Sequence, residues 1–303
     1  MTARLSTTTT LKGLRWFLPL IIAVLPGVAA RAQINNDSGI QAASGVHSLG
    51  TKVGNRQTQT LGGSCNSGEC HISGGTASGN NLFHRLSKLK TTSDINKISL
   101  DNLIPGSASN VYKSVILSNI NPSGTYINTP FELYAGSSNL IILSPGGIEI
   151  GGLAQFSNVG TLSLSTAENL SIGGEIFHYQ NSTPTDLINM TAVINLAQSA
   201  FSHNQAEGGN ISIKVDDLLS IDADLILHSV GGINIESASY ELQGRLKVGG
   251  SVDLAAQGKL KTFTEPVTTA NISGIRIESE SINIHAKGST NADNTISITD
   301  SSA

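Results

Sequence analysis

The side chains of this sequence that are able to do chemistry fall into three groups: two cysteines, seven histidines and one acidic stretch. Cys65 and Cys70 both lie in the segment SCNSGEC, around a turn that contains glycine. In an oxidising compartment such a pair predicts a short local disulfide. The alternative is a metal site with His71, but structural zinc takes four ligands, usually from two separated clusters. We therefore expect a disulfide, which stabilises the fold by about 2 kcal/mol in the chain-entropy model.

The histidines are scattered and include no pair four positions apart and no carboxylate at ligand spacing. They are His47, His71, His84, His178, His203, His228 and His285. General acid–base catalysis needs a positioned partner, and a metal site needs several converging ligands. His84 is interpreted as a packed residue rather than a general base. The sequence therefore predicts no catalytic residue, no cofactor and no metal ion.

The acidic stretch KVDDLLSIDAD is the remaining candidate for a cation site. Its carboxylates are Asp216, Asp217, Asp222 and Asp224. Clustered carboxylates are able to bind Ca²⁺, but here they lack the required ligand spacing. The repeated Gly-Gly-x-Gly-x-Asp pattern of calcium-binding solenoids is also absent. We interpret these residues as solvated strand ends.

Composition limits the fold class and the partners. Aromatic residues make up 4% and charged residues 13% of the 303 residues, against about 25% charged in an average domain. A chain of many glycines and aliphatics with few Glu and Lys favours β-structure over a helical bundle. The net charge of −4, without a Lys/Arg block outside the first residues, excludes nucleic acid as an obligate partner.

Residues 1–32 have the pattern of a signal peptide. Arg4, Lys12 and Arg15 precede the apolar core WFLPLIIAVLPGV, and an Ala-Arg-Ala triplet predicts cleavage after Ala32. The core contains two prolines and is too short to cross a bilayer of about 30 Å as a helix. No later segment is long and apolar enough to do so. We therefore expect an exported chain without a transmembrane segment after cleavage.

From about residue 140, short segments with aliphatics at alternate positions follow glycine-rich corners. Ile211-Ser212-Ile213 and Ile233-Asn234-Ile235 are examples, and this period of two predicts half-buried strands. The glycine pairs begin at 208, 231 and 249, and Ser273-Gly274 continues the series at intervals averaging about 22 residues. Such a repeat favours a parallel β-helix. A sandwich of hairpins is the alternative, although the hairpin dipeptides Asn-Gly and Asp-Gly are absent.

The segment NLIILSPGGIEIGG contains the sharpest corner. Ser144-Pro145-Gly146-Gly147 separates a run of four aliphatics from Ile148-Glu149-Ile150. Pro145 fixes φ and donates no backbone hydrogen bond, while the glycines allow conformations closed to other residues. We predict a sharp corner between two strands of one turn.

Residues 33–135 are less regular and are expected to cover the open end of the solenoid, whose rungs then occupy 136–303 in one continuous domain. In SGNNLFHRLSKLK the spacing of Leu82, Phe83, Leu86 and Leu89 is compatible with a helical face, but an irregular cap fits it equally. HYQNSTPTD at 178–186 predicts a loop or a small extra hairpin that leaves the helix.

The order of several segments resembles the secretion domain of two-partner-secretion exoproteins, the filamentous-haemagglutinin N-terminal family in its cyanobacterial style. The similarity covers about residues 35–170 and is carried by GGTASGNNLFHRLSKL and by the segment from Pro122 to Ala167. The matching motifs are Asn80-Asn81-Leu82-Phe83-His84, Ser138-Asn139-Leu140, Pro145-Gly146-Gly147-Ile148 and Ser165-Thr166-Ala167. Ser144 and Gly146 stand where the family has two asparagines, which puts the efficiency of export in question.

The resemblance implies a right-handed parallel β-helix with an N-terminal cap. It further implies export through the periplasm of a Gram-negative-type bacterium, recognition by an outer-membrane β-barrel transporter with periplasmic modules, and folding outside the cell. Residues 80–84 and 144–147 would then serve recognition or early folding. Many members are longer, so the chain is expected to be a stand-alone domain or a shortened paralogue.

Two functions are compatible with these observations. The first is a non-enzymatic surface or secreted exoprotein that acts in adhesion, with a host-cell, surface or polysaccharide receptor. The second is a β-helical lyase or hydrolase of polysaccharides. The sparse Asp, Glu, Lys and Arg content disfavours the second, because such enzymes need acids and bases converging from successive rungs.

Overall fold

The computed structural model describes residues 39–298, with gaps at 92, 197, 205–208, 216–217, 222–223, 232, 238–243, 249–250, 257–259, 263–274, 279–280 and 287–295. The predicted signal peptide and its cleavage after Ala32 lie outside the described residues. Strands and three short 3₁₀ helices make up the described secondary structure, which confirms the all-β prediction. Within the described residues, no helix has the length and apolarity to cross a membrane.

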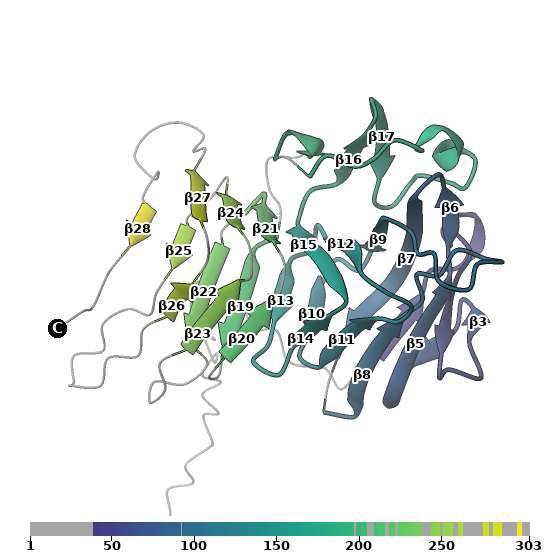
Figure 1. Ribbon diagram of the computed structural model, residues 1–303, viewed down its shortest axis with the longest axis horizontal. Helices are drawn as coiled ribbons and strands as arrows, with labels where there is room; N and C mark the ends of the chain where they lie inside the picture. Colours follow the sequence, from purple (N-terminus) through teal and green to yellow (C-terminus); the bar gives the residue numbers. More distant parts are fainter. Residues whose placement is uncertain are drawn as a thin grey trace, which may run out of the picture. The chain divides into compact units, whose positions relative to one another are not determined.

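The chain winds so that consecutive strands join three different parallel ladders in rotation (Figure 1). The first ladder contains β7 (Asn81–Lys90), β9 (Ser114–Asn119), β12 (Ser138–Leu143), β15 (Val159–Ser165), β21 (Asp224–Ser229), β24 (Ser251–Ala256) and β27 (Ser281–Ala286). Its pairings are all parallel, as expected for turns stacked on one another. The alternative of a hairpin-built sandwich is therefore wrong for this part of the chain.

The other ladders complete each turn. The second contains β10 (Thr125–Ile127), β13 (Ile148–Ile150), β19 (Ile211–Val215), β22 (Ile233–Ser237), β25 (Leu260–Thr262) and β28 (Ile296–Ile298). The third side contains β5 (Gly68–Gly74), β8 (Ile95–Leu100), β11 (Pro130–Leu133) and β14 (Gln155–Ser157), and then β20 (Leu218–Ile221), β23 (Gly244–Val248) and β26 (Ile275–Glu278). One turn is thus three consecutive strands, such as β10, β11 and β12, and the chain forms a parallel β-solenoid.

Aliphatic side chains stack along the solenoid axis. In the first ladder the paired positions are Leu82, Val115, Leu140, Leu162, Leu225, Val252 and Ile282. The first five of these side chains are almost completely buried. Such aliphatic ladders account for the scarcity of aromatics, because each turn must present a side chain of similar size to the turn beside it.

The spacing of about 22 residues predicted for one turn is found in some turns, such as Thr125 to Ile148, but not in all of them. Ile211 pairs with Ile233, but Ile233 pairs with Leu260 and Leu225 pairs with Val252, each 27 positions later. The strand that follows the glycine pair at 249 belongs to the first ladder, whereas those after 208 and 231 belong to the second. The interval between the glycine pairs at 208 and 231 therefore measures one turn, whereas the interval from 231 to 249 joins different sides of the solenoid and does not.

The N-terminal strands pair differently from the rest. β1 (Gly39–Ala42) is antiparallel to β4 (Ser64–Cys65) and β7, β2 (Thr51–Gly54) to β3 (Thr60–Leu61) and β5, and β6 (Thr76–Ser78) to β7. Cys65 and Cys70 form a disulfide that joins β4 to β5. Both sulfur-bearing residues are buried in the interior cluster.

The helical interpretation of residues 80–90 is wrong, because Asn81–Lys90 form the ten-residue strand β7. Leu86 and Leu89 join the solenoid interior, whereas Phe83 faces a second cluster outside it. A register shift in the pairing with β1 brings both Leu86 and Leu89 inward although they are three positions apart. A strand that is buried on both faces and contains such an irregularity produces the spacing of a helical face.

A segment of residues 169–202, here named the excursion, leaves the solenoid after β15. Its strands β16 (Asn169–Ile172), β17 (Glu175–His178) and β18 (Phe201–Ser202) form a small antiparallel sheet, with the 3₁₀ helix η2 (Asp186–Asn189) between them. Of the two alternatives expected at 178–186, a loop or a small extra hairpin, the structure has the loop there, and the hairpin β16–β17 comes directly before it. Figure 1 draws the excursion in teal above the first ladder.

The excursion explains the run Leu140-Ile141-Ile142-Leu143. Leu140 and Ile142 belong to the interior cluster of the solenoid, whereas Ile141 and Leu143 belong to the cluster formed with the excursion. Both faces of β12 are therefore buried, and a strand buried on both faces has a continuous apolar sequence rather than an alternating one. The corner after Leu143 joins β12 to β13, as predicted.

Candidate functional site

The motif at residues 80–84 begins the first ladder of the solenoid. Gly79 and Asn80 form the turn between β6 and β7, and Gly79 has a φ of +55°. The Asn80 side chain is exposed, and its carbonyl accepts a hydrogen bond of 2.9 Å from the backbone N–H of Lys113. Asn80 is therefore a turn residue that also connects β7 to the start of β9.

Three alternate residues of β7 face the excursion. Asn81 Nδ2 donates to the carbonyls of Met190 and Ala192, at 2.9 and 2.8 Å. Phe83 packs against Phe177, with 5.1 Å between the ring centroids. Because strand residues i, i+2 and i+4 share one face, these contacts and those of Arg85 form one continuous attachment.

Arg85 is the most unusual side chain of this attachment. It is fully buried and donates hydrogen bonds to four backbone carbonyls. These bonds run from Nε to Tyr179 at 2.6 Å, from Nη1 to His47 and Ser182 at 2.8 Å each, and from Nη2 to His178 at 3.1 Å. Burial lowers the pKa of Arg85 to about 10, so the guanidinium remains charged at neutral pH. Its charge is compensated by carbonyl dipoles of the excursion and of the loop that contains His47.

The other two motif residues, Leu82 and His84, lie on the opposite, inward face of β7. His84 is completely buried, pairs in register with Leu117 and continues the aliphatic ladder of the interior. Neither of its ring nitrogens has a hydrogen-bond partner. Burial lowers the pKa of His84 to about 3, so the ring is neutral at physiological pH. This geometry agrees with the interpretation of a packed residue, since the ring has no access to a substrate or to solvent.

The corner Ser144–Gly147 is a turn whose Gly147 N–H donates to the Ser144 carbonyl at 2.9 Å. Ser144 Oγ is buried and donates to the carbonyl of Gly147 at 2.9 Å. It accepts from Thr125 Oγ1 at 3.0 Å, and Thr125 Oγ1 accepts from Asn119 Nδ2 at 2.8 Å. A directed chain of hydrogen bonds therefore runs from the preceding turn of the solenoid into this corner.

The corner is stacked between two neighbouring corners without room for side chains. A Cβ at Gly146 would lie 2.5 Å from the carbonyl oxygen of Pro122 and 2.6 Å from the backbone nitrogen of Gly124. On the other side, Gly209 N–H donates to the Pro145 carbonyl at 2.8 Å. An asparagine at position 146, as in the resembling family, would not fit this stack unless the preceding corner moved.

The two motifs lie on different strands of the first ladder, since residues 80–84 begin β7 and Ser144–Gly147 follow β12, with β9 between the two strands. Asn81 shares its register with Asn139 through Ser114, four residues before the end of β12, whereas His84 shares its register with Ile142 through Leu117 and points into the interior. Four residues of strand span roughly 13 Å. The structure thus does not bring residues 80–84 and 144–147 into one site. Both groups are instead built into the stacking of the first turns.

Sequence reasoning missed Arg85 and the corner at Asn121-Pro122-Ser123-Gly124, on which Ser144–Gly147 stack. A cation inside the apolar run NLFHRL was the available signal, because such a charge is almost never buried unless it has partners. Of the four carboxylates in the acidic stretch, only Asp224 lies within the described residues, at the start of β21.

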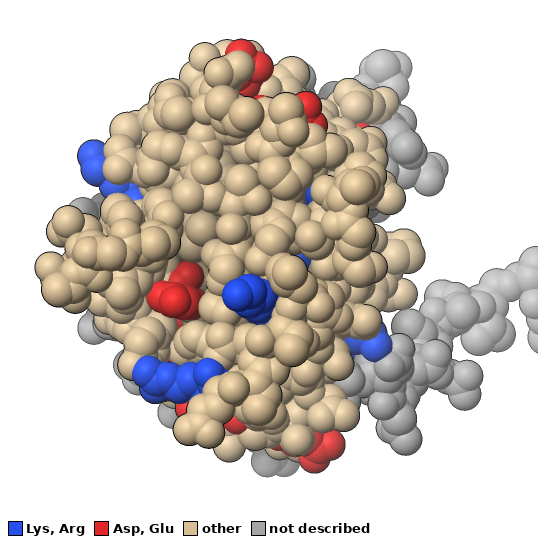
Figure 2. Space-filling view, turned by 90° about the vertical axis from the view of Figure 1, so that its right-hand side faces the viewer, with Lys and Arg blue, Asp and Glu red and all other residues tan. Residues whose placement is uncertain are grey.

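Charged side chains are sparse on the face shown in Figure 2, where Lys, Arg, Asp and Glu are spread over the surface without a continuous patch of one sign. An ion pair in the third side joins Lys97 Nζ to Glu132 at 2.6 Å. In the described part of the chain, no group of three or more His, Cys, Asp or Glu side chains is placed to hold a metal ion.

Comparison with known proteins gives little further information. No protein-family model matches the chain. No curated protein matches it either. A solved structure described as "Crystal structure of filamentous hemagglutinin secretion domain" is similar at 12% identity and a TM-score of 0.35, over 83% of this chain and 98% of that one. This likeness is too weak to support an argument about fold or function, so the motifs and the geometry carry the proposals that follow.

Proposed function

We propose that the chain is a two-partner-secretion exoprotein domain. It crosses the inner membrane by its signal peptide, is recognised by an outer-membrane β-barrel transporter with periplasmic modules, and folds outside the cell as a right-handed solenoid. The observation that carries this proposal is the ordered series of motifs from Asn80 to Ala167. In the structure these motifs span β7 to the segment after β15, within one continuous stack of parallel turns.

The topology supports stepwise folding during export. Each parallel pairing from β9 to β15 joins strands about one turn apart in the sequence, so a turn finds its partner as soon as the chain of that turn has emerged. Strands β1 to β6, which pair largely antiparallel, emerge first, and β5 then gives β8 a parallel partner. We propose that these strands are the N-terminal cap.

A non-enzymatic role at the cell surface, with adhesion as its purpose, completes the proposal. Support comes from the histidines, which lie on separate elements. His84 is sealed in the interior, and His71 has a pKa lowered chiefly by burial. Ser165 Oγ lies 3.2 Å from His228 Nδ1, but Ser165 is completely buried and His228 is only 7% exposed, so this pair is closed off from solvent. The other residues quoted in the motifs form no nucleophile–base pair in the described hydrogen bonds. The motif residues instead serve packing and turn formation.

Binding of the transporter's periplasmic modules tests the proposal. Residues 33–303 would be unfolded in urea and diluted onto immobilised modules from a candidate transporter encoded near this gene. We expect capture of the unfolded chain and weaker capture of the refolded one, because recognition precedes folding. An unrelated unfolded exported protein is the control. Equal capture of that control, or no capture of this chain, would contradict the proposal.

A further inference from the structure

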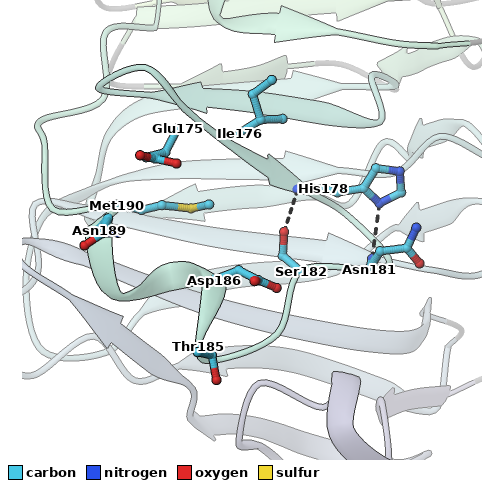
Figure 3. A pocket seen from close by; sticks show the side chains of 9 residues that line it. All are labelled: Glu175, Ile176, His178, Asn181, Ser182, Thr185, Asp186, Asn189 and Met190. Carbon is cyan, nitrogen blue, oxygen red and sulfur yellow. Dashed lines mark hydrogen bonds between the residues drawn. The ribbon is translucent and has the colours of Figure 1, made fainter.

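We propose that the excursion carries a binding site for a neutral saccharide, in an open pocket between β17 and η2. The pocket has a volume of about 470 Å³, within the usual range for small-ligand sites. It is lined by Glu175, Ile176, His178, Asn181, Ser182, Thr185, Asp186, Asn189 and Met190. Figure 3 shows these side chains around one opening, with β17 on one side and η2 on the other.

The walls of this pocket are fixed from behind by the buried face of β7. Arg85 holds the carbonyls of His178 and Ser182, and the His178 N–H donates to Ser182 Oγ at 2.8 Å. Asn81 holds the carbonyl of Met190 at the other wall. The backbone that presents the pocket is therefore anchored to the solenoid, which is the support that a preorganised site on a loop needs.

The polar groups of the pocket select against anions. Glu175 and Asp186 are carboxylates, and none of the lining residues is Lys or Arg. Asp186 Oδ2 accepts from the N–H and the hydroxyl of Thr183, at 2.8 Å each, and these bonds lower the pKa of Asp186. The carboxylate is thus held ionised and in a fixed orientation, as an acceptor for a donor on the ligand.

His178 adds a neutral group. Its Nδ1 accepts hydrogen bonds of 3.2 Å from the backbone N–H groups of Gln180 and Asn181, which places the ring proton on Nε2. Burial lowers the pKa of His178 more than the nearby Glu168 raises it. The lining therefore combines acceptors with the carboxamides of Asn181 and Asn189, which both donate and accept.

This combination of hydrogen-bond acceptors and carboxamides is better suited to bind hydroxyl groups than to bind a cation. Each sugar hydroxyl donates one hydrogen bond and accepts others, so it is able to pair with a carboxylate and a carboxamide together. The lining also includes Ile176, which is 60% exposed, so an apolar face of a sugar ring has a partner. The saccharide would give the proposed surface role a ligand, but the site does not depend on the export route.

Titration of the refolded chain with neutral oligosaccharides tests the site. The probes are cellotetraose, maltotetraose and N-acetylchitotetraose, with spermidine as a cationic probe, followed by calorimetry and ligand-observed NMR. We expect saturable binding of at least one oligosaccharide. Glu175→Gln and Asp186→Asn should each weaken it about tenfold, because each removes a charged hydrogen-bond acceptor. Glu132→Gln, on the third side of the solenoid, is the matched control and should bind like the parent.

Salt dependence separates a saccharide from a cation. Affinity for a neutral ligand should be nearly constant between about 0.05 and 0.5 M salt, whereas affinity for a cation should fall. Binding of spermidine alone, with that fall, would overturn the saccharide assignment. Absence of binding by every oligosaccharide, or binding by both pocket variants as tight as that of the parent, would overturn the site. None of these results bears on capture by the transporter modules, so the two proposals fail separately.

Discussion

Arg85 Nε donates a hydrogen bond of 2.6 Å to the carbonyl of Tyr179, which lies 94 positions later in the chain. The first strand of the main ladder is thereby joined to a loop that the chain makes only after β15. The excursion and the first turn consequently depend on each other, although neither is adjacent to the other in sequence. The buried guanidinium of Arg85 donates to four backbone carbonyls, and three of these carbonyls belong to the excursion.

Replacement of Arg85 should destabilise the chain strongly. Arg85→Met leaves the buried carbonyls without donors and should lower the free energy of unfolding by about 3 kcal/mol, and Arg85→Lys by somewhat less. Urea unfolding of the purified chain measures both. Lys52→Met, at an exposed position of β2, is the control and should stay within about 0.5 kcal/mol of the parent. A loss below that value for Arg85→Met would show that the carbonyl contacts contribute little.

His84 should make stability depend on pH. Its pKa is about 3 when folded, against 6.5 in a free side chain, so the unfolded state takes up a proton first as pH falls. Its contribution is complete above pH 6.5 and is lost between 6.5 and about 3, by up to about 1.4 kcal/mol per pH unit.

His84→Leu removes that titration and keeps an apolar side chain in the interior ladder. The free energy of unfolding at pH 5 and at pH 7.5, measured for both proteins, isolates the His84 contribution from the other histidines. We expect the parent to lose about 2 kcal/mol more than the variant between these values. Identical pH dependence in the two proteins would refute the assignment of a buried neutral ring.

Gly146→Ala should disrupt the stacked corner. The new Cβ would lie against the backbone of Pro122 and Gly124, which has no flexible end to move aside. We expect a loss of more than about 2 kcal/mol in the free energy of unfolding. Gly136→Ala is the control, because its Cβ would meet only the two methyl groups of Val111, at 3.3 and 3.8 Å. Similar losses for the two variants would mean that the corner adapts readily.

The disulfide should stabilise the N-terminal strands modestly. Cys65 and Cys70 close a very short loop, so the entropy removed from the unfolded chain is small. Replacement of both by Ala, or reduction with dithiothreitol, should lower the free energy of unfolding by about 2 kcal/mol. Mass spectrometry of the alkylated chain, with and without reductant, checks that the bond is present. Two free thiols in a chain purified from the periplasm would contradict its formation there.

The fold class was accessible from sequence because alternating aliphatics and glycine corners are local signals. The strand at residues 81–90 was not predictable from sequence. The excursion buries the outer face of β7, so apolar and polar residues do not alternate along this strand. Turn length was also inaccessible, since Val252 and Ile233 lie in different ladders although both follow glycine pairs. A sequence pattern marks corners, but it does not say on which side of a solenoid each corner lies.

The candidate site residues were also predictable from the sequence only in part. Asn80–His84 and Ser144–Gly147 were selected by resemblance, and the structure places each in the stacking of the first turns rather than in a shared pocket. Arg85, the neighbour of His84, donates four side-chain hydrogen bonds to distant segments, against two from Asn81. Its partners are backbone carbonyls of residues about 38 and 93 to 97 positions away, and carbonyls have no sequence signature.

Secretion is the measurement that tests the proposed function most directly. The full chain would be expressed with and without its candidate outer-membrane transporter, and the medium and periplasm would be assayed against a periplasmic marker that reports leakage. The proposal predicts chain in the medium only when the transporter is present. Retention in the periplasm in both strains would contradict two-partner secretion, and so would release without the transporter.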